Sequence, residues 1–332
     1  MLDGISCIIT TGGFDTRPSI IIDEVSNRHL KAKKFPNLPT RIYGSTMSMH
    51  NKSIIVCGGL NNEKKCLLLT HGTWKEHSTL NEERIHHSAV TTQTATFLFG
   101  GTNTGGTRSR TTYEYLPKGS TKWLMGKTEI PEGFLLGCAI VVKSDHEIWL
   151  IGGIWTGKRI LSFNVNDHTF QVLSLQLNIG RSAPRCAFIP TTNKIMVTGG
   201  KNSGIYLDST EILDCEDGSV TLASPMMFKR VGHGMGVITI NGEDRLAAFG
   251  GRGWFSDCGR SVEVYSPQLE CWSTKNIKMK ETKADFGFLC LKLSDVIGAH
   301  GKQGSRRQNS SKDSKIFKRN TTLHASANRS SK

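Results

Sequence analysis

The stretch TFLFGG, residues 96–101, joins four apolar or β-forming residues to a glycine pair. Five other glycine pairs in the 332-residue chain also follow a short apolar run, in CIITTGG, IIVCGG, IWLIGG, IMVTGG and LAAFGG. The six pairs begin at residues 12, 58, 100, 152, 199 and 250, so successive pairs lie 46, 42, 52, 47 and 51 residues apart. Self-similarity at a nearly fixed spacing indicates a repeat protein.

Other residue types recur at nearly the same spacing as the glycine pairs. A small residue lies 12 to 16 residues before each of the last five pairs, as Ser88 does, and β-forming stretches such as TTYEY, STEILD and SVEVY follow the pairs. Most units then reach an aromatic residue, as at Trp74, Trp123 and Trp272. Each unit therefore predicts four strands, called a, b, c and d here, with the glycine pair ending strand b. This is the period and content of a β-propeller blade.

The two ends of the repeat region complement each other. The chain opens on a b strand at residues 5–11 and its folded part closes on an a strand at residues 285–293. We expect the last strand to pair beside the first and to close a ring of six blades, since a closed ring needs no capping repeats. The glycines expected to serve this fold are Gly12, Gly13, Gly58, Gly59, Gly100, Gly101, Gly152, Gly153, Gly199, Gly200, Gly250 and Gly251.

These units resemble kelch repeats. The segment RIHHSAVTTQTATFLFGGTNTGGTRSRTTYEYLPKGSTKW, from Arg84 to Trp123, carries the family's arginine, His-Ser-Ala, double glycine, tyrosine and tryptophan in order. The first unit departs from the pattern with His29 near the tryptophan position, and the fifth has no aromatic residue there. The resemblance spans residues 5–293 and implies that residues 1–293 form an all-β, six-bladed kelch-type propeller, whose C-terminal strand completes the N-terminal blade.

Residues 294–332 differ in composition from the repeats. They hold nine Lys or Arg and two Asp among many Ser and Asn, with few apolar residues, so we predict a disordered basic tail. The whole chain carries a net charge of +14, no apolar run of 18 residues and no secretion leader. We expect a cytoplasmic protein that is not attached to a membrane, with the nucleus as an alternative; secretion would require a leader before residue 1.

Nine cysteines without a CxxC pair favour reduced thiols over a zinc site or a redox motif. Cys57 and Cys66 bracket one glycine turn and are placed to face each other across neighbouring strands. In a secreted form they would be the first disulfide to test.

Enzymatic activity is not expected. The galactose-oxidase-like relatives of kelch proteins hold copper with tyrosine and histidine, but His86 and His87 are adjacent and would face opposite sides of a strand. The GKT at residues 126–128 lacks the glycine that a phosphate-binding loop requires five residues earlier. We therefore predict no catalytic residues, no metal and no cofactor.

The b-to-c and d-to-a loops form the candidate binding face, because the resemblance implies that peptide partners dock there. Cations of the d-to-a loops, namely Arg41, Arg84, Arg181, Arg185 and Arg230, are expected on the same face, although arginines that open an a strand are alternatively structural. Converging arginines bind carboxylates or phosphates and attract acidic partners. The residues predicted to contact a partner are Arg17, Arg108, Arg110, Trp155, Lys158, Arg159, Lys201, Arg252, Trp254, Phe255 and Arg260.

The sequence thus predicts a non-enzymatic interaction module that presents a basic face to an acidic or phosphorylated protein segment. The alternative is substrate recognition for a cullin-based ubiquitin ligase through a separate BTB adaptor, and actin binding is a third association of the family. Nucleic-acid binding by the tail lacks the interleaved aromatic residues that would support it.

Overall fold

The computed structural model describes residues 6–11, 20–23, 31–34, 36–105, 111–131, 137–154, 157–240, 243–253, 257–279 and 287–292. Regular structure in these ranges is almost entirely β, with two short 3₁₀ helices, η2 (Pro190–Thr192) and η3 (Asp257–Arg260). The predicted tail and the first glycine pair, Gly12 and Gly13, lie outside the described residues.

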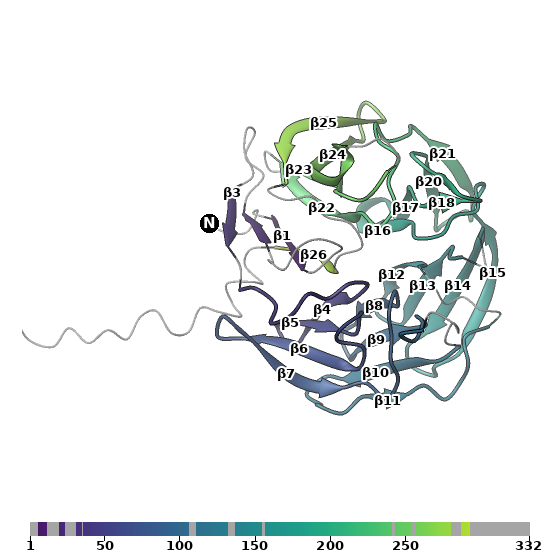
Figure 1. Ribbon diagram of the computed structural model, residues 1–332. Helices are drawn as coiled ribbons and strands as arrows, with labels where there is room; N and C mark the ends of the chain where they lie inside the picture. The colour runs from purple at the N-terminus through teal and green to yellow at the C-terminus, as the bar shows by residue number, and fades with distance from the viewer. Residues whose placement is uncertain are drawn as a thin grey trace, which may run out of the picture. The chain divides into compact units, whose positions relative to one another are not determined.

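Five blades, not the predicted six, are each built from four strands that follow one another in the chain (Figure 1). Within each blade neighbouring strands are antiparallel, so the meander expected from the repeat is confirmed. The first two blades comprise β4 (Thr46–His50), β5 (Ser53–Cys57), β6 (Lys65–Thr70) and β7 (Thr73–Thr79), then β8 (Ser88–Thr91), β9 (Ala95–Phe99), β10 (Tyr113–Pro117) and β11 (Leu124–Met125). The third comprises β12 (Ala139–Ser144), β13 (Glu147–Ile151), β14 (Arg159–Asn164) and β15 (Phe170–Gln176).

The fourth blade carries an addition. Its four strands are β16 (Arg185–Ile189), β17 (Lys194–Thr198), β20 (Thr210–Asp214) and β21 (Val220–Ala223). A small hairpin of β18 (Lys201–Asn202) and β19 (Ile205–Tyr206) is inserted between its b and c strands. The fifth blade comprises β22 (Gly234–Ile240), β23 (Glu243–Phe249), β24 (Ser261–Ser266) and β25 (Cys271–Lys278).

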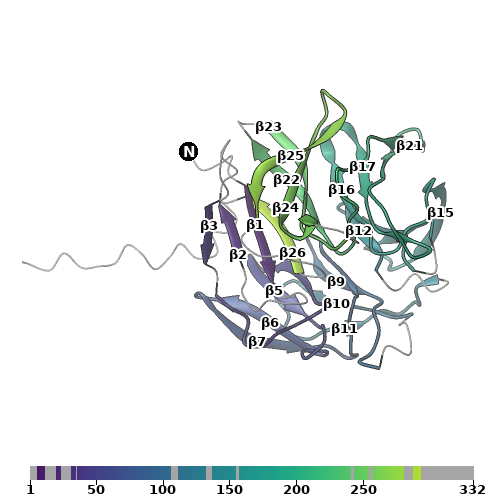
Figure 2. The same ribbon diagram turned by 45° about the horizontal axis from the view of Figure 1, so that its top comes forward.

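A further four-stranded sheet joins the two ends of the chain. β26 (Gly287–Lys292) pairs antiparallel with β1 (Ser6–Thr11), and β2 (Ile20–Asp23) and β3 (Lys31–Lys34) follow in order (Figure 2). The predicted strand exchange is therefore present. The innermost strands contact one another in the cycle β4, β8, β12, β16, β22 and β26, and β26 returns to β4.

The apolar b strands are covered on both faces, as their unbroken runs predict. Along β5, Ile54 and Val56 pack in a cluster that includes Ile9 of β1, whereas Ile55 and Cys57 pack with Leu98 of the next blade. Alternate side chains of a strand point to opposite faces, so each b strand contributes to two interblade cores. The blades are therefore held together by apolar burial on both sides.

The predicted aromatic residues of the d segments bridge blades. Trp123 is 2% exposed, and its indole nitrogen donates to Ser78 Oγ of the preceding blade at 3.0 Å. Trp272 is also buried and donates to Thr210 Oγ1 of the preceding blade at 3.1 Å. A buried indole N–H needs such an acceptor. The prediction that these aromatics pack between blades is confirmed at both positions.

The glycine pairs link neighbouring blades. The second glycine of a pair donates its N–H to the arginine carbonyl that opens the next blade, as Gly200 does to Arg230 at 2.8 Å. The first glycine lies so close that a β-carbon on Gly199 would be 2.5 Å from the same carbonyl oxygen. Both glycines also have positive φ, 59° and 94°. Only glycine meets both requirements.

Candidate functional site

The b-to-c loops and the d-to-a loops lie at one face of the propeller, which we call the loop face. A backbone hydrogen bond of 2.8 Å from Gly59 to Arg84 joins a b-to-c loop to the d-to-a loop beside it. The a-to-b and c-to-d turns lie at the opposite face, where Gly119 donates to Asn51 Oδ1 at 3.2 Å. The described candidate partner contacts, Lys158, Arg159, Lys201, Arg252 and Arg260, belong to segments at the loop face.

Three arginines expected to line the loop face are instead fully buried. Arg84, Arg181 and Arg230 have no exposed surface, and each forms an ion pair with a buried glutamate. The Arg181 guanidinium donates to Glu211 Oε1 at 2.7 Å and to the carbonyl oxygens of Gly199 and Ser209 at 2.9 and 3.0 Å. Their charges and hydrogen-bond donors are satisfied inside the blade, so the expectation that they line the binding face is wrong. The alternative, that these arginines stabilise the blade, is confirmed.

The glutamate partners were missed in the sequence. Glu114, Glu211 and Glu263 lie on the c strands, and each carboxylate also accepts backbone N–H groups of the d-to-a loop. The Glu211 carboxylate, for example, accepts hydrogen bonds from Asn178 N and Ile179 N. A buried charge is tolerated only when it is paired and hydrogen-bonded. A glutamate in the middle of the c strand, as in TTYEY, STEILD and SVEVY, was the signal that could have revealed the pairs.

The predicted partner-contact cations that the structure describes lie on three consecutive blades. Lys158, Arg252 and Arg260 are exposed and Lys201 is half-buried, on the third to fifth blades. Arg159 is half-buried within β14, and the Arg260 Nε atom donates to Met279 O at 2.9 Å, so these two also serve the fold. The other predicted contacts lie outside the described residues: Arg17, Arg108, Arg110, Trp155, Trp254 and Phe255.

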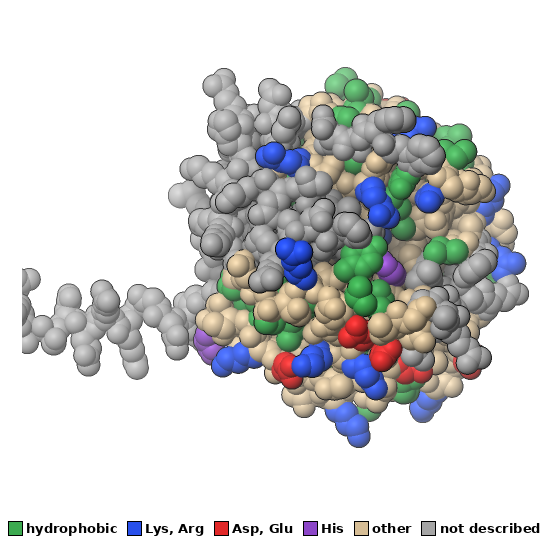
Figure 3. All heavy atoms as spheres, viewed as in Figure 1, with side chains coloured by type: hydrophobic (Ala, Val, Ile, Leu, Met, Phe, Trp, Pro, Cys, Tyr) green, Lys and Arg blue, Asp and Glu red, His purple; other side chains and the backbone are tan. Residues whose placement is uncertain are grey.

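The charge of the loop face is uneven. On the first two blades the half-exposed carboxylates Glu63, Glu82 and Glu83 stand beside the exposed Arg41 and Lys64. In Figure 3 Asp and Glu side chains are seen mainly in the lower part of the face, among Lys and Arg side chains, and further Lys and Arg side chains are seen at the right and the top. Among the described loop-face residues, the cations of the third, fourth and fifth blades are thus less mixed with carboxylates than those of the first two blades.

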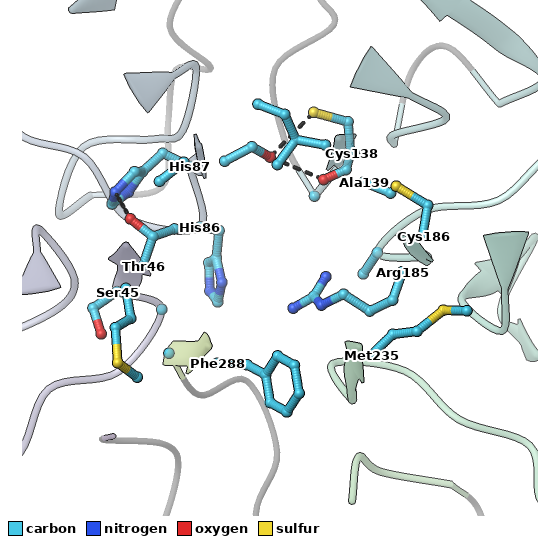
Figure 4. Close-up of a pocket in the computed structure, with 18 residues that line it drawn as sticks. Ser45, Thr46, His86, His87, Cys138, Ala139, Arg185, Cys186, Met235 and Phe288 are labelled. Atoms are coloured by element: carbon cyan, nitrogen blue, oxygen red, sulfur yellow. Dashed lines mark hydrogen bonds between the residues drawn. The ribbon is translucent and has the colours of Figure 1, made fainter. Parts of the chain in front are cut away.

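A pocket of 210 Å³ opens where the a strands begin, around the centre of the ring (Figure 4). Its described lining includes Arg185, His86 and His87 but no Asp or Glu. The Arg185 guanidinium and the His86 ring point toward the middle of the pocket, next to Phe288. Of these residues the sequence analysis singled out only Arg185 as a candidate cation, because convergence of the a strands cannot be seen in one repeat.

Backbone hydrogen bonds between blades form part of the pocket rim. His86 N donates to Gly44 O at 2.8 Å, and Ala183 N donates to Gly137 O at 2.6 Å. All four residues have positive φ, between 49° and 67°. His86 and Ala183 are not glycines, so their backbone conformation costs energy that the surrounding structure must supply. The rim is thus a preformed feature of the ring.

Two buried histidines near the centre are neutral. Burial lowers the pKa of His87 to about 3, with a further contribution from the nearby Arg84 charge, and lowers the pKa of His233 well below its usual value. His87 Nε2 lies 2.6 Å from Thr46 Oγ1, and His233 Nε2 lies 2.9 Å from Thr198 Oγ1. Each of these His–Thr hydrogen bonds joins two adjacent blades through uncharged side chains.

These histidines predict that the propeller loses stability in mild acid. An unfolded histidine has a pKa of about 6.5, so below that pH the unfolded state takes up protons that His87 and His233 in the folded state exclude. Each histidine should lower the free energy of unfolding by about 1.4 kcal/mol per pH unit below about pH 6.5. Urea unfolding at pH 7.5 and 5.5 measures the loss, and the double variant His87→Gln, His233→Gln should show less of it. An equal loss in both proteins would contradict this assignment.

The described cysteines divide into a bonded pair and thiols that are buried or half-buried. Cys57 and Cys66 face each other across β5 and β6 and form a disulfide, at the position that the sequence marked as a candidate. Burial raises the pKa of Cys138 and raises that of Cys186 to about 12. Since the thiolate is the reactive form, both pocket thiols are poor nucleophiles.

Within the described ranges, no three His, Cys, Asp or Glu side chains are grouped as metal ligands would be. In the same ranges, no helix has the length and apolar character to cross a membrane.

Comparison with known proteins agrees with this architecture. The family model described as the Kelch motif matches residues 184–227, which run from the start of β16 through β21 into the following loop. No curated protein sequence matches the chain. The solved structure titled "Structure of YjhT" is similar, with a TM-score of 0.65 and 14% identity over 75% of this chain and 88% of that one, which supports the fold alone. The chain is therefore a β-propeller whose fourth blade matches the Kelch motif.

Proposed function

We propose that the protein is a non-enzymatic interaction module whose loop face binds an acidic or phosphorylated segment of a partner protein. One observation carries the proposal: the exposed cations Lys158 and Arg252, with Lys201 between them, occupy consecutive blades beside a pocket that contains Arg185 and no described carboxylate. Such an arrangement attracts anionic segments over a distance and binds carboxylates or phosphates at contact.

The size of the pocket supports a side-chain anchor. Sites for drug-sized ligands and cofactors occupy about 300–1,000 Å³, whereas this pocket measures 210 Å³. It has room for one acidic side chain of a bound segment, whose carboxylate would meet the Arg185 guanidinium while flanking acidic residues lie over the outer cations. The roles in ubiquitin ligation and actin binding remain predictions, since no observation favours them.

Charge reversal tests this function. The triple variant Lys158→Glu, Lys201→Glu, Arg252→Glu changes the loop face, and Lys52→Glu, Lys118→Glu, Lys122→Glu is its match, because these exposed lysines lie at turns of the opposite face. Both variants lower the net charge by the same amount. Fluorescence anisotropy with a labelled peptide of glutamate and phosphoserine gives the Kd of each protein.

We expect the loop-face variant to bind the peptide at least about tenfold more weakly than the wild type, which corresponds to about 1.4 kcal/mol. The opposite-face variant should stay within about twofold. Equal weakening by the two variants would show that net charge, and not the loop face, attracts the peptide. Failure of the wild-type protein to bind any acidic peptide would also overturn the proposal.

A further inference from the structure

The residue three positions before each buried arginine has the same backbone role in three blades. Asn81 N, Asn178 N and Met227 N each donate to the buried glutamate that pairs with the arginine of their blade, at 2.7, 2.5 and 2.5 Å. The next backbone N–H, as in Phe228, donates to the other carboxylate oxygen. The loop in front of each arginine is thereby fixed by the same pair of hydrogen bonds.

The side chain at this position differs between the blades. In two blades it is asparagine, whose amide returns to the framework: Asn81 Nδ2 donates to Glu114 Oε2 at 2.8 Å, and Asn178 Nδ2 donates to Val220 O at 3.1 Å. In the fifth blade it is Met227, whose side chain is 64% exposed. The fold thus accepts asparagine at this position and gives the methionine side chain no packing role.

The inserted hairpin places a second exposed apolar side chain next to this loop. Ser203 and Gly204, both with positive φ, form the two-residue turn between β18 and β19, and Ile205 directly after it is 62% exposed. The segment after the hairpin is bonded to the Met227 loop, since Met226 N donates to Asp208 O at 2.8 Å and Arg230 N to Leu207 O at 2.9 Å. Ile205 and Met227 therefore stand on adjoining, rigidly held backbone.

Cations lie on the same backbone segments as the two apolar side chains and on the neighbouring b-to-c loop. Lys201 lies on the hairpin with its Nζ atom 5.4 Å from the Tyr206 ring centroid, and Lys229 is exposed two residues after Met227. Arg252 of the fifth blade is exposed and its N–H donates to Val231 O at 2.9 Å, at the end of the same loop. Asp208 is the one acidic residue in segments 199–209 and 225–231 that is not buried.

We propose that Ile205 and Met227, with Lys201, Lys229 and Arg252 around them, form an anchor for an amphipathic acidic peptide segment of a partner protein. We call these five residues the Met227 surface. A bulky apolar side chain of the segment packs between Ile205 and Met227, and its flanking Asp or Glu residues meet the cations. Hydrogen bonds already hold the backbone of both segments, so binding does not have to order it. This inference rests on the proposed function and narrows it to one part of the loop face.

The test selects peptides on the full-length protein and measures them on matched variants. A displayed library of random dodecapeptides is selected on the wild type, and the enriched sequences are synthesised. Met227→Asn restores the residue found in the other two blades and should leave the unfolding midpoint unchanged, as should Ile205→Ser. The control is Leu269→Ser, which removes an apolar side chain that is 74% exposed in a c-to-d turn of the opposite face.

We expect enriched peptides to carry a bulky apolar residue flanked by Asp or Glu. Their Kd should rise at least about tenfold for Met227→Asn and Ile205→Ser, and less than about twofold for Leu269→Ser. Peptides that bind both variants like the wild type but lose affinity for the loop-face charge-reversal variant would overturn this inference and leave the proposed function standing. Affinity unchanged in every variant, or enrichment without acidic residues, would overturn both.

Discussion

The variant Gly199→Ala is expected to lose at least about 3 kcal/mol of stability or to fail to fold. The new β-carbon would lie 2.5 Å from the Arg230 carbonyl oxygen and 2.9 Å from the His233 ring. The carbonyl is backbone of the next blade and accepts the Gly200 N–H, so it cannot move away without breaking the link between blades. The clash adds to the cost of placing alanine at a φ of 59°, which is of order 1 kcal/mol.

Gly218→Ala separates these two costs. Gly218 also has positive φ, 71°, but a β-carbon there would meet nothing within 4 Å. We therefore expect a loss of about 1 kcal/mol from backbone strain alone. Urea unfolding followed by circular dichroism measures both variants. Similar losses at Gly199 and Gly218 would show that the approach of the next blade does not explain the glycine pair.

The variant Arg181→Met should lose about 3–5 kcal/mol. It would leave the Glu211 carboxylate buried without its cation and would remove the donors to Gly199 O and Ser209 O. Breaking a buried ion pair from one side is costly because the remaining charge is uncompensated. The same urea titration measures the loss, and Arg181→Met combined with Glu211→Gln should recover part of it, since the second change removes the stranded charge.

Arg41→Met is the matched control for the buried arginine. Arg41 opens the first blade at the corresponding place in the sequence but is exposed. In that blade the carbonyl oxygen of Gly58, the first glycine of its pair like Gly199, accepts from Asn62 Nδ2 at 3.2 Å. Exposed substitutions of this kind change stability by about 0.5 kcal/mol or less. A loss below about 1 kcal/mol for Arg181→Met would contradict the structural role assigned to the buried arginines.

The fold was largely predictable because its signal is repeated. A single TFLFGG stretch is compatible with many turns, but six copies at blade spacing predict the b strands, and the small and aromatic positions predict the innermost strands and the bridging Trp123 and Trp272. The strand exchange followed from the unmatched ends and is present in the pairing of β26 with β1. Six blades were predicted, whereas consecutive strands form five, because the remaining four-stranded sheet is assembled from the two ends of the chain.

The site was less predictable because charge alone does not reveal burial. Arg181 and Arg230 look like loop cations in the sequence, and only their contact with Glu211 and Glu263 shows that they belong to the core of a blade. Met227 could be recognised only once Asn81 and Asn178 had been placed in the same hydrogen-bonded role. Comparison of the repeats then identifies a candidate binding residue, because a side chain that differs at a position with a shared backbone role is not explained by the fold.

The ratio of peptide Kd values between the two triple charge-reversal variants tests the central claim most directly. Both variants carry the same net charge, so the ratio reports position alone. The loop-face binding account predicts a ratio above about five at low salt that shrinks as salt is raised, because exposed charges are screened over about 10 Å at 0.1 M. A ratio near one at every salt concentration would contradict it.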